Sequence, residues 1–332
     1  MDLTEKMAGR KRVVGIGSAL MDILIQAEEP FLEKVGAVKG GMRLVEENEI
    51  HRALSMAADE PVMVPGGSAC NTVVGIGKMG GQSRFLGKCG ADETGRLFEN
   101  DLKAQCVEPD LLRSRLPTGK VLSIITPDKQ RSMLTFLGAS ARMRPEEIRM
   151  RRFEDAAVVH IEGYLLFNQA LMFAALSAAK NAGALISLDL ASFTVVETHK
   201  DVLAAIVHDY VDILMANEDE ARVFTGRDNE ADALRQLSKY ATVAILKVGK
   251  RGSYIAVGED VVKIKPVVGG RAVDTTGAGD LWASGFLHAF IKGHSPLKCG
   301  QLGSLCGHAV CQVVGTHISE AHWVQIRQKM EA

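Results

Sequence analysis

Short runs of apolar residues recur along the chain and are typical of buried strands. The six clearest runs are 13–16, 84–87, 158–161, 185–188, 213–215 and 243–247. Helical stretches separate several of them, and within 168–181 Leu171, Ala174, Ala175 and Ala178 lie at helical spacing. Because strands that alternate with helices build βαβ units, the pattern predicts an α/β fold with a doubly wound, mostly parallel sheet and helices on both faces.

Two regions, 22–46 and 118–140, break this rhythm because neither shows helical periodicity. In the second region, two strand-like runs flank the turn 127–130, which predicts a β-hairpin. We expect the two regions to form a small β-sheet lid over a ligand at the carboxyl ends of the core strands. The predicted core comprises 1–17, 47–115 and 142–332, and the predicted discontinuous lid comprises 18–46 and 116–141.

Composition and charge narrow the function classes. The 332 residues are 47% hydrophobic and 24% charged, as expected of a globular protein with a sizeable core. Lys and Arg total 39 against 40 Asp and Glu, so the formal net charge is −1. No global field would therefore draw the chain onto nucleic acid or an anionic membrane, and we expect neither as a partner.

Cysteine usage and hydropathy predict a cytoplasmic protein. Six cysteines without a C-x-x-C pair fit small buried hydrophobic residues in a reducing compartment. Residues 299–319 carry no Asp, Glu, Lys or Arg, but Gly, Gln and His interrupt the run. A spanning helix needs about 20 predominantly apolar residues, so this stretch predicts a buried helix instead.

The heptapeptide DTTGAGD at 274–280 carries the strongest chemical signal, because it opens the apolar helix LWASGFLHAFIKG. Small residues leave the N–H groups of the first helical turn unobstructed, and the positive end of the helix dipole points to the same spot. The segment therefore predicts an anion hole for a phosphate. Asp280 lies at its mouth, where we expect an ionised carboxylate that accepts a proton from an alcohol attacking phosphorus. A helix cap without a ligand is the alternative.

A second segment, GGSACN at 66–71, begins with a glycine pair that lets a ligand approach the backbone. We expect Ser68 to cap a helix that runs to about Gly80, with Asn71 facing the ligand. A plain loop-to-helix junction is the alternative. The match to G-x-G-x-x-G at 75–80 is rejected, because that motif needs a strand before it and a helix after it.

Two more segments suit a nucleotide. NEDE at 217–220 follows the strand-like VDILMA and places carboxylates at a strand's carboxyl end, where a hydrated Mg²⁺ fits. KVGKRG at 247–252 follows VAIL and can wrap phosphates. Alone, the first is more often a solvated helix start and the second a hairpin turn. No G-x-x-x-x-G-K-[ST] occurs, which excludes the classical P-loop.

In order and spacing, GGSACN, NEDE and DTTGAGD resemble the ribokinase or PfkB carbohydrate-kinase family over roughly residues 12–320. The resemblance implies a ribokinase-like core with a β-sheet lid, and ATP- and Mg²⁺-dependent phosphorylation of a hydroxymethyl group on a sugar or nucleoside. GIGSALMDILI, Glu162-Gly163-Tyr164 and TPDKQRSMLTFLGAS look most like the adenosine-kinase branch. That branch implies transfer to the 5′-hydroxyl of a ribonucleoside, adenosine first.

The resemblance also assigns roles to residues of this chain. The catalytic set is Asp280 as the base, with Gly277, Ala278 and Gly279 as the anion hole. The residues expected at the substrate are Ser18, Asp22, Gly66, Gly67, Asn71 and Glu162. The residues expected at ATP are Asn217, Lys247, Gly249, Gly252 and Thr276, with Glu220 reaching Mg²⁺ through water. By resemblance alone, a monovalent cation such as K⁺ fits near Asp274 and Gly315, and the chain is a monomer or a homodimer.

Two positions depart from the adenosine-kinase pattern. Ser18 stands where that branch usually has Asn, which puts one sugar contact in doubt. Lys247 stands where many members have Thr, although several sugar kinases share the Lys. A kinase for ribose, fructose or 2-keto-3-deoxygluconate is therefore the alternative function.

The wall beyond the ribose separates the two functions. A nucleoside needs an apolar slot for its base, from lid residues such as Phe136 or Leu137, whereas a sugar acid needs a cation. Arg131 and Arg142 flank that region, so the sequence leaves both substrates open. A ligand-binding regulator without catalysis has no direct support, because the base, the anion hole and the metal residues are all present.

Overall fold

The computed structural model describes residues 3–7, 9–128 and 130–331. Its larger sheet contains nine strands, β1 (Arg12–Ile16), β5 (Ser83–Gly90), β6 (Glu108–Ser114), β9 (Ala156–Glu162), β10 (Leu185–Asp189), β11 (Ile213–Asn217), β12 (Val243–Lys247), β13 (Ser253–Val257) and β14 (Asp260–Ile264). The strand order is β14-β13-β12-β11-β10-β9-β1-β5-β6. From β12 to β6 all neighbours are parallel, and β13 and β14 add an antiparallel edge.

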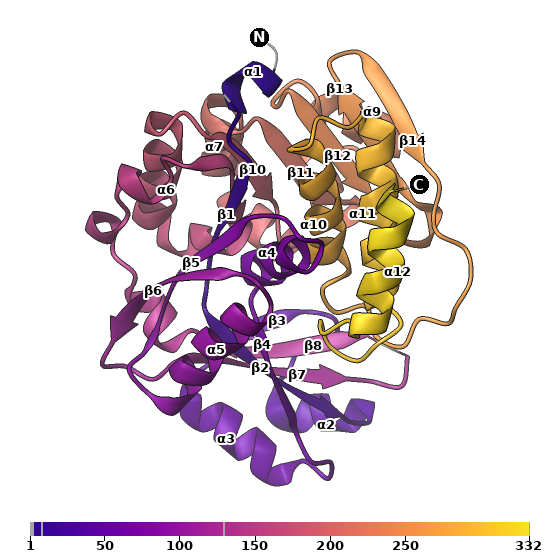
Figure 1. Cartoon of the computed structure of the whole chain (residues 1–332). Helices are drawn as coiled ribbons and strands as arrows, with labels where there is room; N and C mark the ends of the chain where they lie inside the picture. The colour runs from indigo at the N-terminus through magenta and orange to yellow at the C-terminus, as the bar shows by residue number, and fades with distance from the viewer. Residues whose placement is uncertain (1–2, 8, 129, 332) are drawn as a thin grey trace.

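Helices cover both faces of this sheet (Figure 1). One face packs against α6 (Gln169–Asn181), α7 (Phe193–Tyr210), α8 (Glu218–Thr225) and α9 (Glu230–Leu237). The other packs against α1 (Leu3–Met7), α4 (Ser68–Lys78), α5 (Glu93–Ala104), α10 (Ala278–Phe290), α11 (Pro296–Val310) and α12 (Glu320–Glu331). Successive residues of a strand point to opposite faces of the sheet. Val14 therefore packs on the face covered by α6, α7, α8 and α9, and Val13 packs on the other face. The predicted doubly wound α/β fold is confirmed.

A separate five-stranded sheet lies below the large one in Figure 1. It contains β2 (Leu20–Gln26), β3 (Met42–Leu44), β4 (Val62–Gly66), β7 (Gly119–Ile125) and β8 (Arg131–Phe136), in the order β3-β8-β7-β2-β4. Two helices, α2 (Glu29–Val35) and α3 (Glu47–Met56), pack on one of its faces. β7 and β8 form the predicted antiparallel hairpin, although Lys129 of its turn lies outside the described residues.

The structure differs from expectation at two places in this sheet. A helix, α2, occupies part of the region 22–46, where no helical periodicity was found. It is seven residues long, with a proline in its first turn and a left-handed Gly36 after its last, and is too short for a periodic signal. In addition, β4 and α3 come from the segment 47–115 that we assigned to the core, yet they belong to the small sheet. The division into core and lid stays a prediction.

Five short 3₁₀ segments complete the described chain. They are η1 (Gly138–Arg142), η2 (Pro145–Glu147), η3 (Met150–Arg152), η4 (Gly163–Asn168) and η5 (Gly249–Arg251). Among the described residues, no helix combines the length and the apolar character that crossing a membrane requires.

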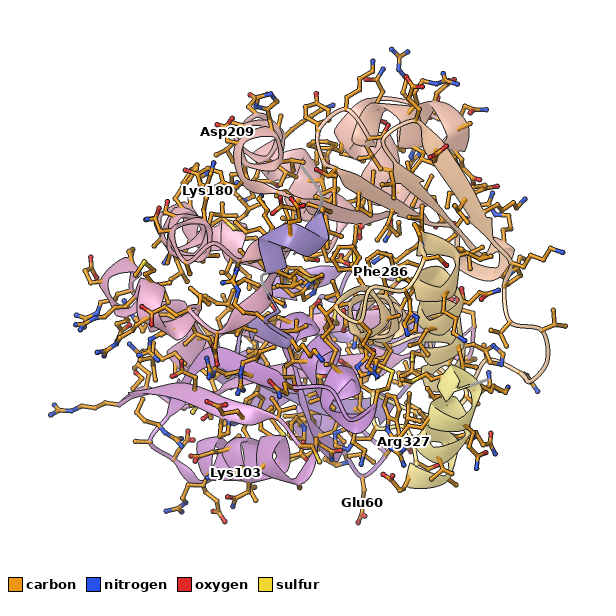
Figure 2. The ribbon with its side chains drawn as sticks, turned by 45° about the horizontal axis from the view of Figure 1, so that its top comes forward. Glu60, Lys103, Lys180, Asp209, Phe286 and Arg327 are labelled. Atoms are coloured by element: carbon orange, nitrogen blue, oxygen red, sulfur yellow. The ribbon has the colours of Figure 1, made fainter. Side chains whose placement is uncertain are left out.

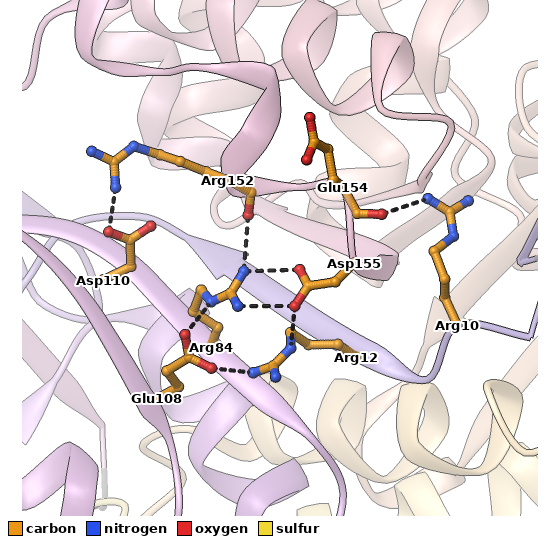
Figure 3. A network of polar contacts seen from close by, with 8 residues as sticks. All are labelled: Arg10, Arg12, Arg84, Glu108, Asp110, Arg152, Glu154 and Asp155. Carbon is orange, nitrogen blue, oxygen red and sulfur yellow. Dashed lines mark hydrogen bonds and ion pairs between the residues drawn. The ribbon is translucent and has the colours of Figure 1, made fainter.

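A network of charged side chains joins β1, β5, β6 and β9 at their amino ends (Figure 3). Arg84 donates to both carboxylate oxygens of Asp155, each at 2.9 Å, and to Glu108 at 2.8 Å. Arg12 pairs with the same two acids. The two acidic side chains are half exposed, so each ion pair contributes little to the stability of the fold. The alternating charges nevertheless connect the amino ends of four strands.

Helix α10 runs through the interior of the molecule. Its Phe286 stacks with Trp282 and Phe290 at ring-centroid distances of 5.5 and 5.8 Å, whereas Lys103 and Lys180 project at the surface (Figure 2). His288 on the same helix is fully buried, and neither ring nitrogen has a hydrogen-bond partner within the described residues. Burial lowers the pKa of His288 to about 4.

This histidine predicts a pH-dependent effect of His288→Leu. The folded-state pKa of His288 lies below the ordinary 6.5, so the unfolded chain binds the proton first as the pH falls, and the native protein loses stability between those values. The leucine variant lacks this titrating group, so it does not lose stability in this way as the pH falls. Relative to the native protein, the variant should therefore gain about 2 kcal/mol in unfolding free energy between about pH 7.5 and pH 5. Urea denaturation at both pH values measures it, with His51→Leu, an exposed histidine on α3, as control. A difference that does not change with pH would contradict the prediction.

Candidate active site

A cavity of about 810 Å³ lies between the two sheets, at the carboxyl edge of the larger one. The last residues of four adjacent parallel strands line it, namely Glu162 of β9, Asp189 of β10, Asn217 of β11 and Lys247 of β12. This is the edge at which open α/β sheets bind ligands. The amino end of α10 and the inner face of the small sheet close the cavity from other sides.

The heptapeptide 274–280 forms a tight turn into α10. Gly277 precedes the helix at φ 71°, a left-handed conformation, and a Cβ there would lie 2.6 Å from Thr316 Cγ2. The N–H of Ala278 donates to the Thr275 carbonyl at 3.2 Å, and the helical ladder begins with Leu281, whose N–H donates to Gly277 at 2.8 Å. The amides of Gly279 and Asp280 lie between them and have no intrahelical partner. Gly277, Ala278 and Gly279 all line the cavity, and their predicted anion hole stays a prediction.

The buried side chain of Asp274 holds this turn through hydrogen bonds. Its carboxylate accepts hydrogen bonds from the Thr276 N–H at 2.9 Å, from the Thr276 hydroxyl at 2.7 Å and from the Gly315 N–H at 2.8 Å. The Thr276 hydroxyl therefore faces Asp274, and it is Thr275, not Thr276, that lines the cavity. Both carboxylate oxygens of Asp274 thus have partners, one in the turn and one at Gly315, and the monovalent-cation site stays a prediction.

The Asp280 carboxylate is clamped by the first turn of α4. The Ser68 hydroxyl donates to one of its oxygens at 2.8 Å and the Asn71 amide to the other at 2.9 Å. Burial raises the pKa of Asp280, and these two hydrogen bonds oppose the rise. Asp280 is thus held in one orientation at the cavity wall, beside the open amides of α10.

The expectation that Ser68 caps α4 is wrong. Gly67 is the N-cap residue, with φ 103°, and Ser68 is the first residue of the helix, which ends at Lys78. The reason is tertiary, because the hydroxyl that would cap the helix is bound to Asp280 on another helix. Asn71 lines the cavity and its side-chain amide donates to the same carboxylate, and the expectation that it faces a ligand stays a prediction.

Glu162 ties the loop after β1 to the start of α4. Its two oxygens accept from the Ser18 N–H at 2.8 Å and the Ala69 N–H at 3.0 Å. Burial raises the pKa of Glu162 to about 7, and the two backbone hydrogen bonds oppose the rise. A side chain at Gly17 would overlap the Glu162 carboxylate, so only glycine fits there. Glu162 therefore positions the backbone of Ser18 and of Ala69, close in sequence to the glycine pair that was predicted to hold the substrate.

Alternation along the strands divides the small sheet into two faces. Ile23, Leu122, Ile124 and Leu134 pack under α2 and α3, while their neighbours line the cavity. The cavity-facing set is Leu20 and Asp22 of β2, Met42 and Leu44 of β3, Val121 of β7, and Arg131, Met133 and Thr135 of β8.

Asp22 is the buried acid of this face. Burial raises its pKa to about 6, and Arg131 opposes the rise. Gly66 lies directly behind it, where a Cβ would overlap the Asp22 carboxylate, and Gly66 itself is not among the lining residues. Gly67 lines the cavity in front.

The residues named for the two possible substrate walls differ in where they lie. Leu137 lines the cavity as proposed, and the stacked rings of Tyr164 and Phe167 lie 6.3 Å apart on the opposite element η4. Phe136 does not line the cavity, because it points to the face that packs under α2 and α3. Of the two arginines, Arg131 lines the cavity and Arg142 is exposed outside it.

Asn217 and Glu220 form a capping box at the start of α8. Asn217 donates to the two Glu220 oxygens at 2.7 and 2.8 Å, and the Glu220 N–H donates back at 2.9 Å. Burial raises the pKa of Glu220 to about 8. Glu220 lines the cavity. Since both its oxygens are engaged, it fits a hydrated metal better than direct ligation.

The remaining lining residues suit a nucleotide. Lys247, Gly249 and Gly252 line the cavity as predicted, and His308 and Gln312 form its far wall. Within the described residues, no group of three or more His, Cys, Asp or Glu side chains could hold a metal by itself. A Mg²⁺ ion that binds mainly to phosphate oxygens and water, as is usual for this metal, fits this set.

Asp189 and Ala191 were missed by the sequence analysis. Asp189 forms an ion pair with Lys247 at 2.6 Å and accepts a hydrogen bond from the Ala191 N–H at 3.0 Å. Asp189 directly follows the predicted apolar run 185–188, so polar residues at every strand's carboxyl end were a usable signal. The strained backbone of Ala191, at φ 69°, has no sequence signal.

Comparisons with known proteins agree with this geometry. The family model described as "pfkB family carbohydrate kinase" matches residues 29–323. The crystal structure of an adenosine kinase from Sinorhizobium meliloti superimposes with a TM-score of 0.91 at 30% identity, covering 96% of this chain and 99% of that one. A nucleoside kinase from Methanocaldococcus jannaschii is 28% identical over 80% of this chain and 85% of its own length. A probable fructokinase-7 from Arabidopsis thaliana is 30% identical over 70% of this chain and 72% of its own.

The contact between Gly17 and Glu162 gives a stability prediction. Gly17→Ala should lower the unfolding free energy by about 1–3 kcal/mol, because the added methyl displaces a carboxylate that two backbone amides hold. In a Glu162→Ala background the same change should cost less by at least about 0.5 kcal/mol, since the obstacle is gone. Denaturation of the four proteins of this cycle measures both. Additive effects would show that the two residues do not interact.

Proposed function

The chain belongs to the pfkB family of carbohydrate kinases, and on that basis we propose that it transfers the γ-phosphoryl group of ATP to the 5′-hydroxyl of a ribonucleoside, adenosine first. One observation carries the proposal. The Asp280 carboxylate is fixed by Ser68 and Asn71 at the amino end of α10, beside amides that have no intrahelical partner. A base and an anion site thus share one helical turn, which in-line phosphoryl transfer requires.

The residues divide the chemistry between them. Asp280 accepts the proton of the attacking hydroxyl, and the amides of Gly279 and Asp280 face the charge that develops on the phosphoryl oxygens. Mg²⁺, when bound with the nucleotide, neutralises phosphate charge, with Glu220 reaching it through water. Asp22 and Gly67 bind the sugar hydroxyls, and Glu162 keeps the backbone of Ser18 and Ala69 in place around them.

Two observations support a nucleoside over a free sugar. The apolar residues Met42, Leu44, Met133 and Leu137 line the same cavity as the stacked rings of Tyr164 and Phe167, and such a lining suits a planar base. The adenosine kinase of Sinorhizobium meliloti, at 30% identity, has the same fold over nearly the whole chain.

A sugar kinase is the second candidate, for ribose, fructose or 2-keto-3-deoxygluconate. It is favoured by Arg131, a cation on the cavity wall next to the buried Asp22, which suits a sugar acid. The similarity to a probable fructokinase at 30% identity points the same way.

Asp280→Asn tests the role of the base. The substitution keeps the size of the side chain but removes its basicity, so turnover should fall about 10²- to 10⁴-fold. Affinity for ATP and the melting temperature should stay close to native values. Coupled measurement of ADP release, calorimetric titration of ATP and thermal melts check the three expectations, with exposed Asp260→Asn as control. Turnover near the native rate in Asp280→Asn would refute the assignment.

The acceptor is tested by ADP release with Mg-ATP across adenosine, inosine, guanosine, cytidine, ribose, fructose and 2-keto-3-deoxygluconate. We expect turnover with adenosine at micromolar concentration, because the base fills the apolar slot. Turnover confined to a free sugar would retain Asp280 and the anion site but replace the nucleoside. The absence of turnover with every acceptor would favour a ligand-binding regulator instead.

A further inference from the structure

Three neighbouring strands of the large sheet end in polar residues on the face toward α10. Asn217 of β11 is in register with Lys247 of β12, and Asp189 of β10 is in register with Met215, two residues before Asn217. Met215 packs in the cluster that contains α10, so all three polar side chains share its side of the sheet. Lys247 therefore reaches back across β11 to pair with Asp189.

This ion pair is buried and fixed from both sides. The Lys247 and Asp189 side chains are only 13% and 8% exposed, and Nζ lies 2.6 Å from Oδ2. The other Asp189 oxygen accepts from the N–H of Ala191, a non-glycine residue in the left-handed region. Such backbone conformations persist where the surroundings enforce them, and they gather at functional sites.

The ammonium group points at the amino end of α10. A Cβ placed on Gly279 would lie 3.2 Å from Lys247 Nζ, so the ammonium lies against the backbone of the first helical turn. It carries three N–H donors, of which Asp189 takes one, and Lys247 lines the cavity. Burial by itself would lower the pKa of Lys247, but the carboxylates of Asp189 and Glu220 raise it above its ordinary value. A fixed positive charge thus lies beside the amides of Gly279 and Asp280, which have no intrahelical partner.

A purely structural pair is a poor explanation for this arrangement. Taking two charges out of water costs about as much as their attraction returns, so buried pairs contribute little net stability. A cation held at a helix amino end does, however, form a site for an anion with more than one charge.

We propose that Lys247 binds the phosphoryl group in flight between ATP and the acceptor, and that Asp189 is the positioning residue that aims it. The proposal rests on the kinase function proposed above. In the transfer, a bond forms between the acceptor oxygen and the γ-phosphorus while the bond to the β,γ-bridging oxygen breaks. The hydroxyl proton goes to Asp280, and the electron pair of the broken bond stays on the β-phosphate of ADP. Lys247 stabilises the oxygens of the group that moves.

The test separates binding of the γ-phosphate from every other role. Lys247→Met should weaken ATP binding about 10- to 100-fold and leave ADP binding within about threefold, because only ATP carries the γ-phosphate. Turnover should fall about 10²- to 10³-fold. Asp189→Asn, which keeps the shape and the acceptor for Ala191, should show the same selectivity for ATP with a smaller loss. Asp189→Glu, which restores the charge, should recover part of it.

Calorimetric titration of each protein with Mg-ATP and Mg-ADP measures the selectivity, and thermal melts verify the fold. Lys239→Met, an exposed lysine outside the cavity, is the control with the same change in net charge. If Lys247→Met lost the same affinity for ADP as for ATP, the pair would be structural and the proposal would be overturned. A lowered melting temperature with unchanged ATP affinity would overturn it as well. Binding is measured without an acceptor, so an ATP-selective loss would support the inference even if no nucleoside or sugar in the panel turned over.

Discussion

The site depends on the clamp that two residues of α4 place on the carboxylate of Asp280. Ser68 and Asn71 lie more than two hundred residues before Asp280 in the chain, and their hydrogen bonds hold the start of α4 against the first turn of α10. Thr72 adds a bond to the Asp280 carbonyl at 3.1 Å, so the helix backbone is held as well as its side chain. The starts of α4 and α10 are therefore joined through one carboxylate and one carbonyl.

Around this clamp, buried charges at the strand ends balance one another. Burial favours the neutral forms of Glu162, Glu220 and Asp280 and raises the pKa of each. Hydrogen bonds from amides oppose that shift at all three carboxylates, and Lys247 adds an opposing positive charge at Glu220 and Asp280. The three carboxylates are thus held between burial, which favours the neutral form, and hydrogen bonds and positive charge, which favour the ionised form.

Local patterns in the sequence predicted the parts of this molecule that local interactions determine. The buried strands and the turn into α10 follow from apolar runs and from small residues before a helix, so they were found. The cap of α4 was assigned to Ser68 because Ser is a good cap, but a contact across the fold takes its hydroxyl. Asp189 was missed for the same reason, because its partner Lys247 lies 58 residues away. Likewise, no pattern in the sequence indicated that Glu162 holds the backbone of Ser18, 144 residues away.

The small sheet shows why the reaction class is easier to infer than the substrate. Its outer face must bury Ile23, Leu122 and Leu134 under two helices, which fixes the register of β2, β7 and β8. The register in turn determines which positions of the small sheet face the cavity. It does not determine the amino acids at those positions, because substitutions there leave the packing under α2 and α3 undisturbed. At the start of α10, in contrast, the backbone amides and the clamped Asp280 carboxylate are fixed by contacts of the fold itself. The inner face, where Arg131 and Met133 lie among apolar neighbours, is the part of the cavity wall that the fold constrains least, and under the function proposed above it is where a base and a sugar acid would be distinguished.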